Sequence, residues 1–319
     1  MSREQLLEIV GQFDRLNIIV IGDIMLDKYI WGKVNRISPE APVPVVNIEK
    51  TEYRVGGAGN VASNLSELKC HASILTITGD DHNSEILATR LRKHNVLPLF
   101  EKDHSRSTTV KSRILAQRQQ LVRMDQEKTS PFSDSQTNKL LSLLNSHSNQ
   151  LDAVILSDYD KGLLSENFIK KIISNFRKIP LIIDPKARDY ERYKGATVIK
   201  PNYQEFCDAI NKDQLPLDKF DQFAKKLVDN YDFNGLIVTL GERGVYYYDN
   251  GKSRIIPTEA HEVYDVSGAG DTFTAAFTAS YVISNDFYLS ARIGNLASAV
   301  AVEKVGTAAV TRKELLAKI

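Results

Sequence analysis

Short apolar runs alternate along the chain with longer amphipathic segments. The runs 17–21, 153–157 and 236–240 are almost wholly apolar, as expected for strands buried on both faces of a sheet. Between them, segments such as 218–230 repeat apolar residues at helical spacing. This alternation predicts a three-layer α/β fold with a mainly parallel sheet. We expect further strands at 72–77, 181–184, 198–200 and 245–248, and helices near the start and at 84–94, 133–144, 168–176 and 293–301.

Four segments read as short strands outside this alternation: 29–32, 43–48, 109–115 and 119–124. Prolines 39, 42 and 44 exclude a helix between the first two. We expect excursions at about 28–48 and 109–125 to form a small β lid, and a dimer contact, on a single domain spanning 1–319.

Composition narrows the class of protein. Hydrophobic residues make up 42% of the chain and charged residues 25%, which is ordinary for a soluble globular protein. The 41 basic residues balance the 40 acidic ones, so no overall field attracts nucleic acid or an anionic membrane. Cys70 and Cys207 lack metal-ligand spacing and are expected to be buried thiols in a reducing compartment. Residues 1–10 are too charged for a signal peptide, no apolar run could span a membrane, and we expect a cytoplasmic protein.

The stretch 265–273 carries the strongest candidate chemistry. Gly268, Ala269 and Gly270 precede a segment with apolar residues on one helical face, so they lie where a loop becomes a helix. Small residues there leave the first N–H groups of the helix free for an anion. Asp271 would repel a phosphate already bound, which favours a base that takes a proton from an attacking hydroxyl. The alternative is that Asp271 only caps the helix.

A second glycine segment, Gly56-Gly57-Ala58-Gly59-Asn60, formally fits a dinucleotide-binding fingerprint together with Ala62. That fingerprint opens directly from the first buried strand of its sheet, whereas the preceding residues 50–54 are too polar for such a strand. NAD binding is therefore disfavoured. We expect the glycines to bring backbone N–H groups and Asn60 close to another small polar ligand.

Carboxylates follow the first buried strand, at the end where ligands of open α/β sheets bind. Asp23 comes just after 17–21, and Asp27 follows four residues later. Each reads equally well as a ligand-binding residue or as an ordinary turn or surface residue. Other polar segments follow later strands, at 158–162, 184–186, 200–205 and 239–244.

Two of these later segments have a spacing that suits a nucleotide. Asn202 and Glu205 stand one helical turn apart and could hold hydrated Mg²⁺ through its waters, or simply favour the dipole of a helix. Gly241 and Gly244 could admit a base or a phosphate, or form an ordinary turn. The 6 histidines are scattered without ligand spacing, so we assign them no metal site.

These residues together resemble a known family. The stretch 265–273 is similar to the C-terminal signature of ribokinase-like (phosphofructokinase B-type) sugar kinases, and the resemblance extends from about Asn17 to Ala309. It includes the glycine segment, the Asn202-x-x-Glu205 element and 239–244. Within that family, three segments resemble D-glycero-β-D-manno-heptose 7-phosphate kinases: 22–27, 36–45 and 119–125.

The resemblance implies a role for each candidate residue. Asp271 would deprotonate the anomeric hydroxyl, while the N–H groups of Gly268, Ala269 and Gly270 would stabilise charge on the transferred phosphoryl group. Asn202 and Glu205 would position Mg²⁺ and the phosphates of ATP. The remaining implied contacts are with the nucleotide for Thr239, Gly241, Gly244 and Asn295, with sugar hydroxyls for Asp23, Asp27, Gly57 and Asn60, with the 7-phosphate for Lys111, Arg113 and Lys186, and with K⁺ for Asp265 and the segment 302–306.

The implied reaction moves the γ-phosphoryl group of ATP to O1 of heptose 7-phosphate, giving the 1,7-bisphosphate for ADP-heptose and lipopolysaccharide core synthesis. The chain departs from the family pattern at Val266 and Ser267, where threonine is common. It has no H-x-G-H motif of the nucleotidyltransferase to which many such kinases are fused, so we expect a free-standing kinase or one half of a bifunctional protein. A fructose- or ribose-type kinase on the same fold, and an inactive regulator that binds nucleotide or sugar, stay open as alternatives.

Overall fold

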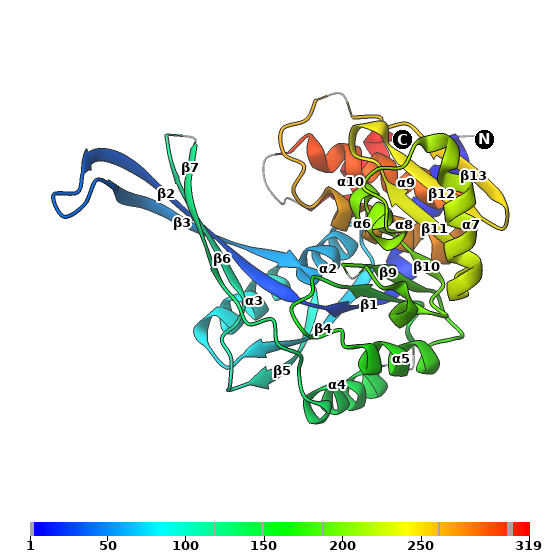
Figure 1. Cartoon of the computed structure of the whole chain (residues 1–319), viewed down its shortest axis with the longest axis horizontal. Coiled ribbons are helices and arrows are strands. Elements are labelled where there is room, and N and C mark those ends of the chain that lie inside the picture. The colour runs from blue at the N-terminus through cyan, green and yellow to red at the C-terminus, as the bar shows by residue number, and fades with distance from the viewer. Residues whose placement is uncertain (1–2, 118, 148–149, 187, 261, 305–308) are drawn as a thin grey trace.

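The computed structural model describes residues 3–117, 119–147, 150–186, 188–260, 262–304 and 309–319, which form a main body and one projecting sheet (Figure 1). Within these residues, the body contains a nine-stranded sheet of order β13-β12-β11-β10-β9-β8-β1-β4-β5. From β5 to β11 neighbouring strands run parallel, and β12 and β13 add an antiparallel hairpin. The strands are β1 (Asn17–Gly22), β4 (His71–Gly79), β5 (Leu97–Asp103), β8 (Ala153–Ser157), β9 (Leu181–Asp184), β10 (Val198–Ile199), β11 (Gly235–Thr239), β12 (Val245–Asp249) and β13 (Lys252–Ile256).

Alternating side chains of these strands divide the core into two layers. Ile18 and Val20 of β1 pack on one face of the sheet, and Ile19 and Ile21 pack on the other. The first face is covered by α1 (Arg3–Gly11), α2 (Ala58–Glu67), α3 (His82–Lys93), α8 (Ala269–Ser284), α9 (Phe287–Val302) and α10 (Arg312–Lys318), and the second by α4 (Asp134–His147), α5 (Glu166–Asn175), α6 (Tyr203–Ala209) and α7 (Phe220–Tyr231). The predicted three-layer α/β fold is confirmed.

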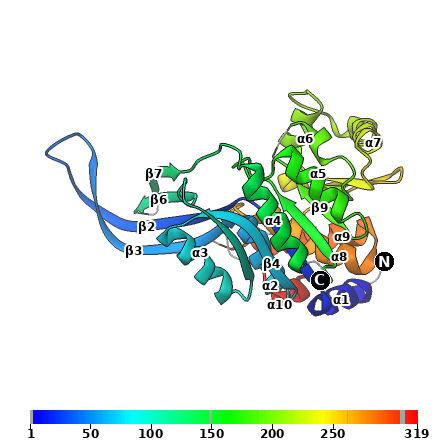
Figure 2. The same cartoon turned by 90° about the horizontal axis from the view of Figure 1, so that it is seen from below.

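The four predicted lid segments form one sheet of order β3-β2-β6-β7 that projects from the body (Figure 2). Its strands are β2 (Ile24–Ile37), β3 (Pro44–Gly57), β6 (Val110–Ala116) and β7 (Gln119–Gln126). The prediction of short strands at 29–32 and 43–48 is wrong, because β2 and β3 are 14 residues each. The outer half of each strand is exposed or half-buried, so no apolar alternation marks its full length.

Three further findings bear on the class of protein. Cys70 and Cys207 are buried free thiols, as predicted. No helix in the described part of the chain is long and apolar enough to cross a lipid bilayer. The described residues also contain no group of three or more His, Cys, Asp or Glu side chains placed to hold a metal ion.

Candidate active site

Asp271 is a buried carboxylate in the first turn of α8. The helix begins at Ala269 after Gly268, whose left-handed φ of 82° is a conformation that glycine adopts without steric penalty. No side chain caps this helix. The Asp271 carboxylate instead accepts hydrogen bonds from Asn60 Nδ2 at 2.7 Å and from the Tyr159 hydroxyl at 2.7 Å. The alternative that Asp271 is only a helix cap is therefore wrong.

The surroundings of Asp271 make its carboxylate a stronger base than an exposed aspartate. Burial raises the pKa of Asp271 to about 6, and the charge of Asp184 adds to the rise. The hydrogen bonds from Asn60 and Tyr159 and the charge of Lys200 lower that pKa. Burial also raises the pKa of Tyr159 well above its usual value, so the phenol keeps its proton and donates it to the hydrogen bond. At neutral pH Asp271 is ionised and suited to accept a proton.

The glycine segment brings Asn60 to Asp271. It closes β3 and opens α2, with Gly57 as the residue before the helix and Asn60 in its first turn. A Cβ atom on Gly56 would collide with the carboxylate of Asp27, so glycine is required there for close approach. Because β3 belongs to the projecting sheet and is not the first strand of the parallel sheet, the segment lacks the context of a dinucleotide fingerprint.

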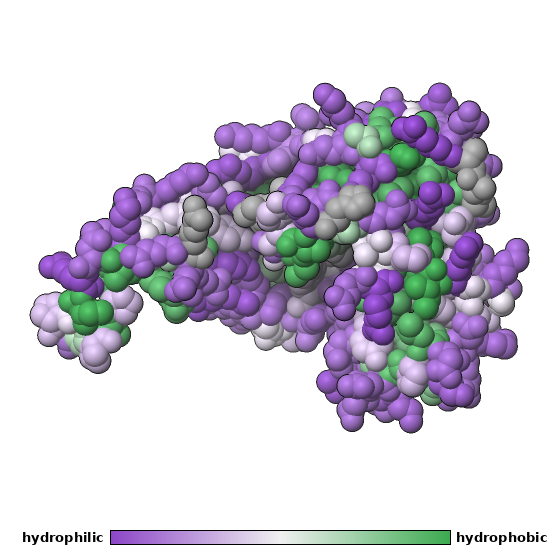
Figure 3. Space-filling model, turned by 90° about the horizontal axis from the view of Figure 1, so that it is seen from above, coloured by the Kyte–Doolittle hydropathy of each residue, from purple (hydrophilic) through white to green (hydrophobic). Residues whose placement is uncertain are grey.

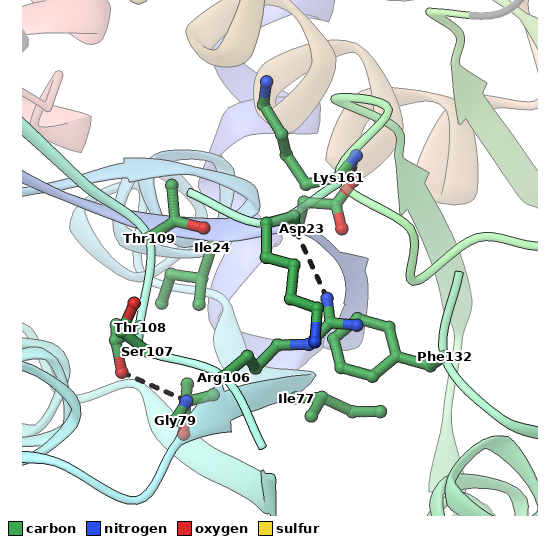
Figure 4. A pocket seen from close by; sticks show the side chains of 12 residues that line it. Asp23, Ile24, Ile77, Gly79, Arg106, Ser107, Thr108, Thr109, Phe132 and Lys161 are labelled. Atoms are coloured by element: carbon green, nitrogen blue, oxygen red, sulfur yellow. Dashed lines mark hydrogen bonds between the residues drawn. The ribbon is translucent and has the colours of Figure 1, made fainter. Parts of the chain in front are cut away.

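Asp23 holds the loop that carries Tyr159. Its carboxylate accepts three backbone N–H bonds from that loop, two of them from Tyr159 at 3.2 Å and Lys161 at 3.0 Å. Burial raises the pKa of Asp23 to about 6. Figure 4 shows Asp23 and Lys161 at a small pocket whose wall includes Arg106 and Phe132, with the guanidinium 3.6 Å from the ring centroid. Asp23 thus positions the Tyr159 loop, a role that the sequence did not predict.

Two cations expected at the 7-phosphate lie on β6 of the projecting sheet. Arg113 Nη1 lies 2.5 Å from Asp27 Oδ1, on the neighbouring strand β2. Lys111 Nζ lies 3.1 Å from Asp125 Oδ2, on the opposite neighbour β7. The family resemblance implied contacts of Asp27 and Arg113 with different parts of the sugar, whereas the structure joins the two residues in one ion pair.

Asn202 and Glu205 form a capping box at the start of α6. Asn202 Oδ1 accepts from the Glu205 N–H at 2.9 Å, and Glu205 Oε2 accepts from the Asn202 N–H at 3.0 Å. The helix-start alternative is therefore present in the structure. Glu205 Oε1 accepts from Lys186 Nζ at 3.0 Å, so this expected phosphate ligand lies beside α6 and not with Lys111 and Arg113 on β6 (Figure 1).

The other nucleotide candidates lie at strand ends near α6 and on α9. Thr239 ends β11 and pairs with Asn202 in an isolated parallel bridge. Gly241 and Gly244, with left-handed φ values of 63° and 90°, bound a short 3₁₀ turn, as the turn alternative proposed. Asn295 on α9 donates to the carbonyl of Pro257 at 2.6 Å and so holds the segment after β13.

Asp265 lies where the loop before α8 meets the end of α9. Its Oδ1 accepts from the Ser267 N–H at 2.8 Å. The N–H groups of Tyr264 and Asp265 donate to the carbonyl of Val302 at 2.8 and 3.3 Å. The structure thus brings together the two segments expected to bind K⁺, although residues 305–306 lie outside the described residues.

Sequence reasoning missed three polar residues beside Asp271, in addition to Tyr159. Asp184 Oδ1 lies 3.0 Å from Lys200 Nζ, and Asp184 Oδ2 accepts from the Thr274 hydroxyl at 2.9 Å. Burial raises the pKa of Asp184. Tyr159, Asp184 and Lys200 belong to polar segments that follow strands, which is the signal that could have found them.

A family model described as pfkB family carbohydrate kinase matches residues 15–314. The chain belongs to this family. It is 38% identical to the bifunctional protein HldE of Geobacter sulfurreducens, covering 100% of this chain and 66% of that protein. It is 40% identical to the HldE protein of Actinobacillus succinogenes, covering 96% of this chain and 64% of that protein. The chain therefore spans about two thirds of the length of these relatives.

Solved structures share the fold of this pfkB-family chain. Phosphofructokinase-2 from Escherichia coli has a TM-score of 0.78 at 17% identity, covering 94% of this chain and 97% of that one. Ribokinase from Arabidopsis thaliana, complexed with ribose and ATP, has a TM-score of 0.73 at 18% identity, covering 95% of this chain and 98% of that one. Together with the family match, these findings confirm the resemblance to ribokinase-like sugar kinases. The protein is a carbohydrate kinase.

Proposed function

We propose that this kinase transfers the γ-phosphoryl group of ATP to O1 of D-glycero-β-D-manno-heptose 7-phosphate, giving the 1,7-bisphosphate for ADP-heptose and lipopolysaccharide core synthesis. The observation that carries the transfer chemistry is the buried Asp271 carboxylate, held between Asn60 and Tyr159 at the start of α8. The choice of acceptor is supported by the segments 22–27 and 36–45 and by the similarity to HldE proteins across the chain.

In the proposed reaction Asp271 takes the proton of the acceptor hydroxyl while the oxygen of that hydroxyl attacks the γ-phosphorus. The new O–P bond forms, the bond from the γ-phosphorus to the β,γ-bridging oxygen breaks, and ADP leaves. The N–H groups of Gly268, Ala269 and Gly270 stabilise charge on the group in transfer, because they lie at the positive end of α8.

Oxygen ligands on the nucleotide side fit Mg²⁺, which when bound neutralises phosphate charge. Both Glu205 carboxylate oxygens already accept hydrogen bonds, so Asn202 and Glu205 would hold the ion through its water molecules. Thr239, Gly241, Gly244 and Asn295 would border the nucleotide. Asp265, with the segment beginning at Val302, would bind K⁺.

The sugar is proposed to lie between α2 and the projecting sheet. Gly57, Asn60 and Asp27 would face its hydroxyls, and Asp23 would act by fixing the Tyr159 loop. Lys111 and Arg113 would bind the 7-phosphate after exchanging their carboxylate partners for it. Lys186 would instead serve the phosphates of ATP, because it contacts Glu205.

A panel of sugars with ATP and Mg²⁺, followed by ³¹P NMR, tests this function. We expect heptose 7-phosphate to give ADP and a new anomeric phosphate in equal amounts. Faster turnover of fructose or ribose would contradict the acceptor and favour a kinase of another sugar. If none of the sugars in the panel gives ADP, the result would favour an inactive regulator that binds nucleotide or sugar.

We also infer that two copies pair through the projecting sheet. Ile37, Val43 and Ile48, at the far end of the β2–β3 hairpin, are 60%, 51% and 63% exposed, and Figure 3 shows apolar side chains there. Exposed apolar residues in such a cluster are typical of protein contacts. Light scattering at micromolar protein should give twice the chain mass of 35.8 kDa, and a monomeric mass would contradict the pairing.

A further inference from the structure

Lys200 is a buried lysine directly after β10, at the end of the sheet where the site lies. The residue is 3% exposed. Its Nζ lies 3.0 Å from Oδ1 of Asp184, the last residue of the neighbouring parallel strand β9. Burying an ammonium is costly even when it is paired, and two apolar residues of similar volume are often at least as stable. The ion pair therefore points to a role in the chemistry of the site.

Asp184 connects Lys200 to the start of α8. Its second oxygen accepts a hydrogen bond from the Thr274 hydroxyl at 2.9 Å. A Cβ atom built on Gly270 would lie 3.9 Å from Lys200 Nζ, so the ammonium lies beside the glycine turn that precedes Asp271. Two strands and one helix thus fix the ammonium at the place where the phosphoryl group is expected.

Two positive features meet at this turn. The N-terminus of α8 carries the positive end of the helix dipole and its free N–H groups. The Lys200 ammonium adds a positive charge beside it, and the Asp184 carboxylate pairs with this ammonium at 3.0 Å. An anion at the turn is attracted by both features, so the arrangement favours an anion more strongly than α8 alone does.

We propose that Lys200 contacts the γ-phosphoryl group during its transfer and that Asp184 is the positioning residue that holds the ammonium there. The inference rests on the proposed transfer at Asp271 and not on the identity of the sugar. As the acceptor oxygen bonds to the γ-phosphorus, its proton passes to Asp271, and the electron pair of the broken bridging bond leaves with ADP. The fixed ammonium stabilises the oxygens of the group in transit and needs no rearrangement to do so.

Lys200→Met keeps most of the side-chain volume and removes the charge. We expect kcat to fall roughly 10²–10³-fold, as for loss of one charged donor at a transition state. The KM of the sugar and the Kd of ADP should change by less than about threefold, because the contact acts on the group in transfer. The affinity for ADP with aluminium fluoride, which mimics that group, should fall in parallel with kcat. Lys139→Met is the matched control, because it breaks an ion pair with Glu101 (2.9 Å) that joins α4 to β5.

Lys200→Met leaves Asp184 buried without its cation, so a second variant guards against misfolding. Asp184→Asn/Lys200→Met removes both charges and is expected to fold and to show a similar loss of kcat. Lys200→Arg keeps the charge and should retain more activity than Lys200→Met. Wild-type kcat in a folded Met or double variant, or a loss of ADP binding as large as the loss of kcat, would overturn the proposal.

The sugar panel separates this inference from the proposed function. Rates of the Lys200 variants are compared on whichever sugar the wild type turns over. A wild type that prefers ribose overturns the proposed acceptor but leaves the comparison at Lys200 intact. A wild type that transfers phosphate to no sugar overturns both.

Discussion

The main sheet and the projecting sheet use charged residues in different ways. In the main body, Asp23 directly after β1 and Asp271 in the first turn of α8 are buried and hydrogen-bonded, and burial raises the pKa of each to about 6. On the projecting sheet, Lys111 and Arg113 are partly exposed and pair with carboxylates of neighbouring strands. Under the proposed function the two sheets would divide the roles: the buried set would carry the transfer chemistry, and Lys111 and Arg113 would exchange their carboxylate partners to select the acceptor.

The largest effect should come from removing the base in the buried set. Asp271→Asn keeps the side-chain shape but cannot accept the proton, so kcat should fall roughly 10²–10⁴-fold. ADP affinity, measured by calorimetry, should stay within about threefold of wild type, since the base acts on the acceptor. Asp229→Asn, on the exposed face of α7, is the control. Near-normal turnover of Asp271→Asn would contradict the proposal that the buried set carries the transfer chemistry.

The next largest difference should be in stability: truncating a side chain should lower the free energy of unfolding more in the main sheet than in the projecting sheet. Ile155 in β8 is fully buried, so Ile155→Ala should lower the free energy of unfolding by about 2–5 kcal/mol. Val122 in β7 is 44% exposed, and Val122→Ala should change the free energy of unfolding by less than about 0.5 kcal/mol. Urea unfolding of both variants measures the difference. Equal losses would show that the projecting sheet is packed like the core.

Acceptor choice should depend on the projecting sheet. Arg113→Met should lower kcat/KM for a sugar phosphate by about 10–100-fold, because a charge-assisted contact contributes about 1.5–3 kcal/mol. The free sugar should be affected much less. Because the substitution also leaves Asp27 without its partner, Asp27→Asn/Arg113→Met is measured beside it. Equal losses for both sugars would contradict a phosphate contact at Arg113.

The smallest effect should come from removing the charge of Glu127. This carboxylate forms ion pairs with Lys111 of the projecting sheet and with Lys161 of the Tyr159 loop. Glu127 pairs with Lys161 at 2.8 Å and with Lys111 at 3.4 Å, and the hydrogen bond from Lys161 is the main cause that lowers the pKa of Glu127. A depressed pKa stabilises the fold above the unfolded pKa, and that stability is lost as the pH falls through the folded pKa. Glu127→Gln should therefore cost at most about 1 kcal/mol at pH 7, measured by urea unfolding. The difference from wild type should vanish well below about pH 4, and a cost that persists there would contradict an ionic origin.

The main sheet could be predicted from the sequence because its strands are buried on both faces. The run 18–21 is apolar for that reason. The edge strand β5 was missed because its residues are mostly half-buried, and β3 was cut short because most of its residues are exposed or half-buried. Helix α8 was recognised from the apolar residues that recur from Phe273 onward, and it begins at Ala269, within the glycine segment predicted to open it.

The site could be predicted only where its signal is local. The spacing of Gly268, Gly270 and Asp271 lies within one helical turn, so the sequence displays it directly. The Tyr159 hydrogen bond to Asp271 joins residues 112 positions apart, and no sequence pattern near either residue indicates the contact. The pairing of Lys111 with Asp125 likewise depends on the register of β6 and β7.

The central claim, that the hydrogen-bonded Asp271 carboxylate is the base, is tested most directly by the acid limb of kcat/KM in wild type and Tyr159→Phe. The active form is the carboxylate, so kcat/KM should fall as the pH drops through about 6. The Tyr159 hydrogen bond lowers the pKa of Asp271, so its removal should move the limb to higher pH. The substrate phosphate titrates in the same way with both enzymes, so it does not contribute to the shift between their two pH profiles. A limb that stays in place or moves to lower pH would contradict the assignment of Asp271 as the base.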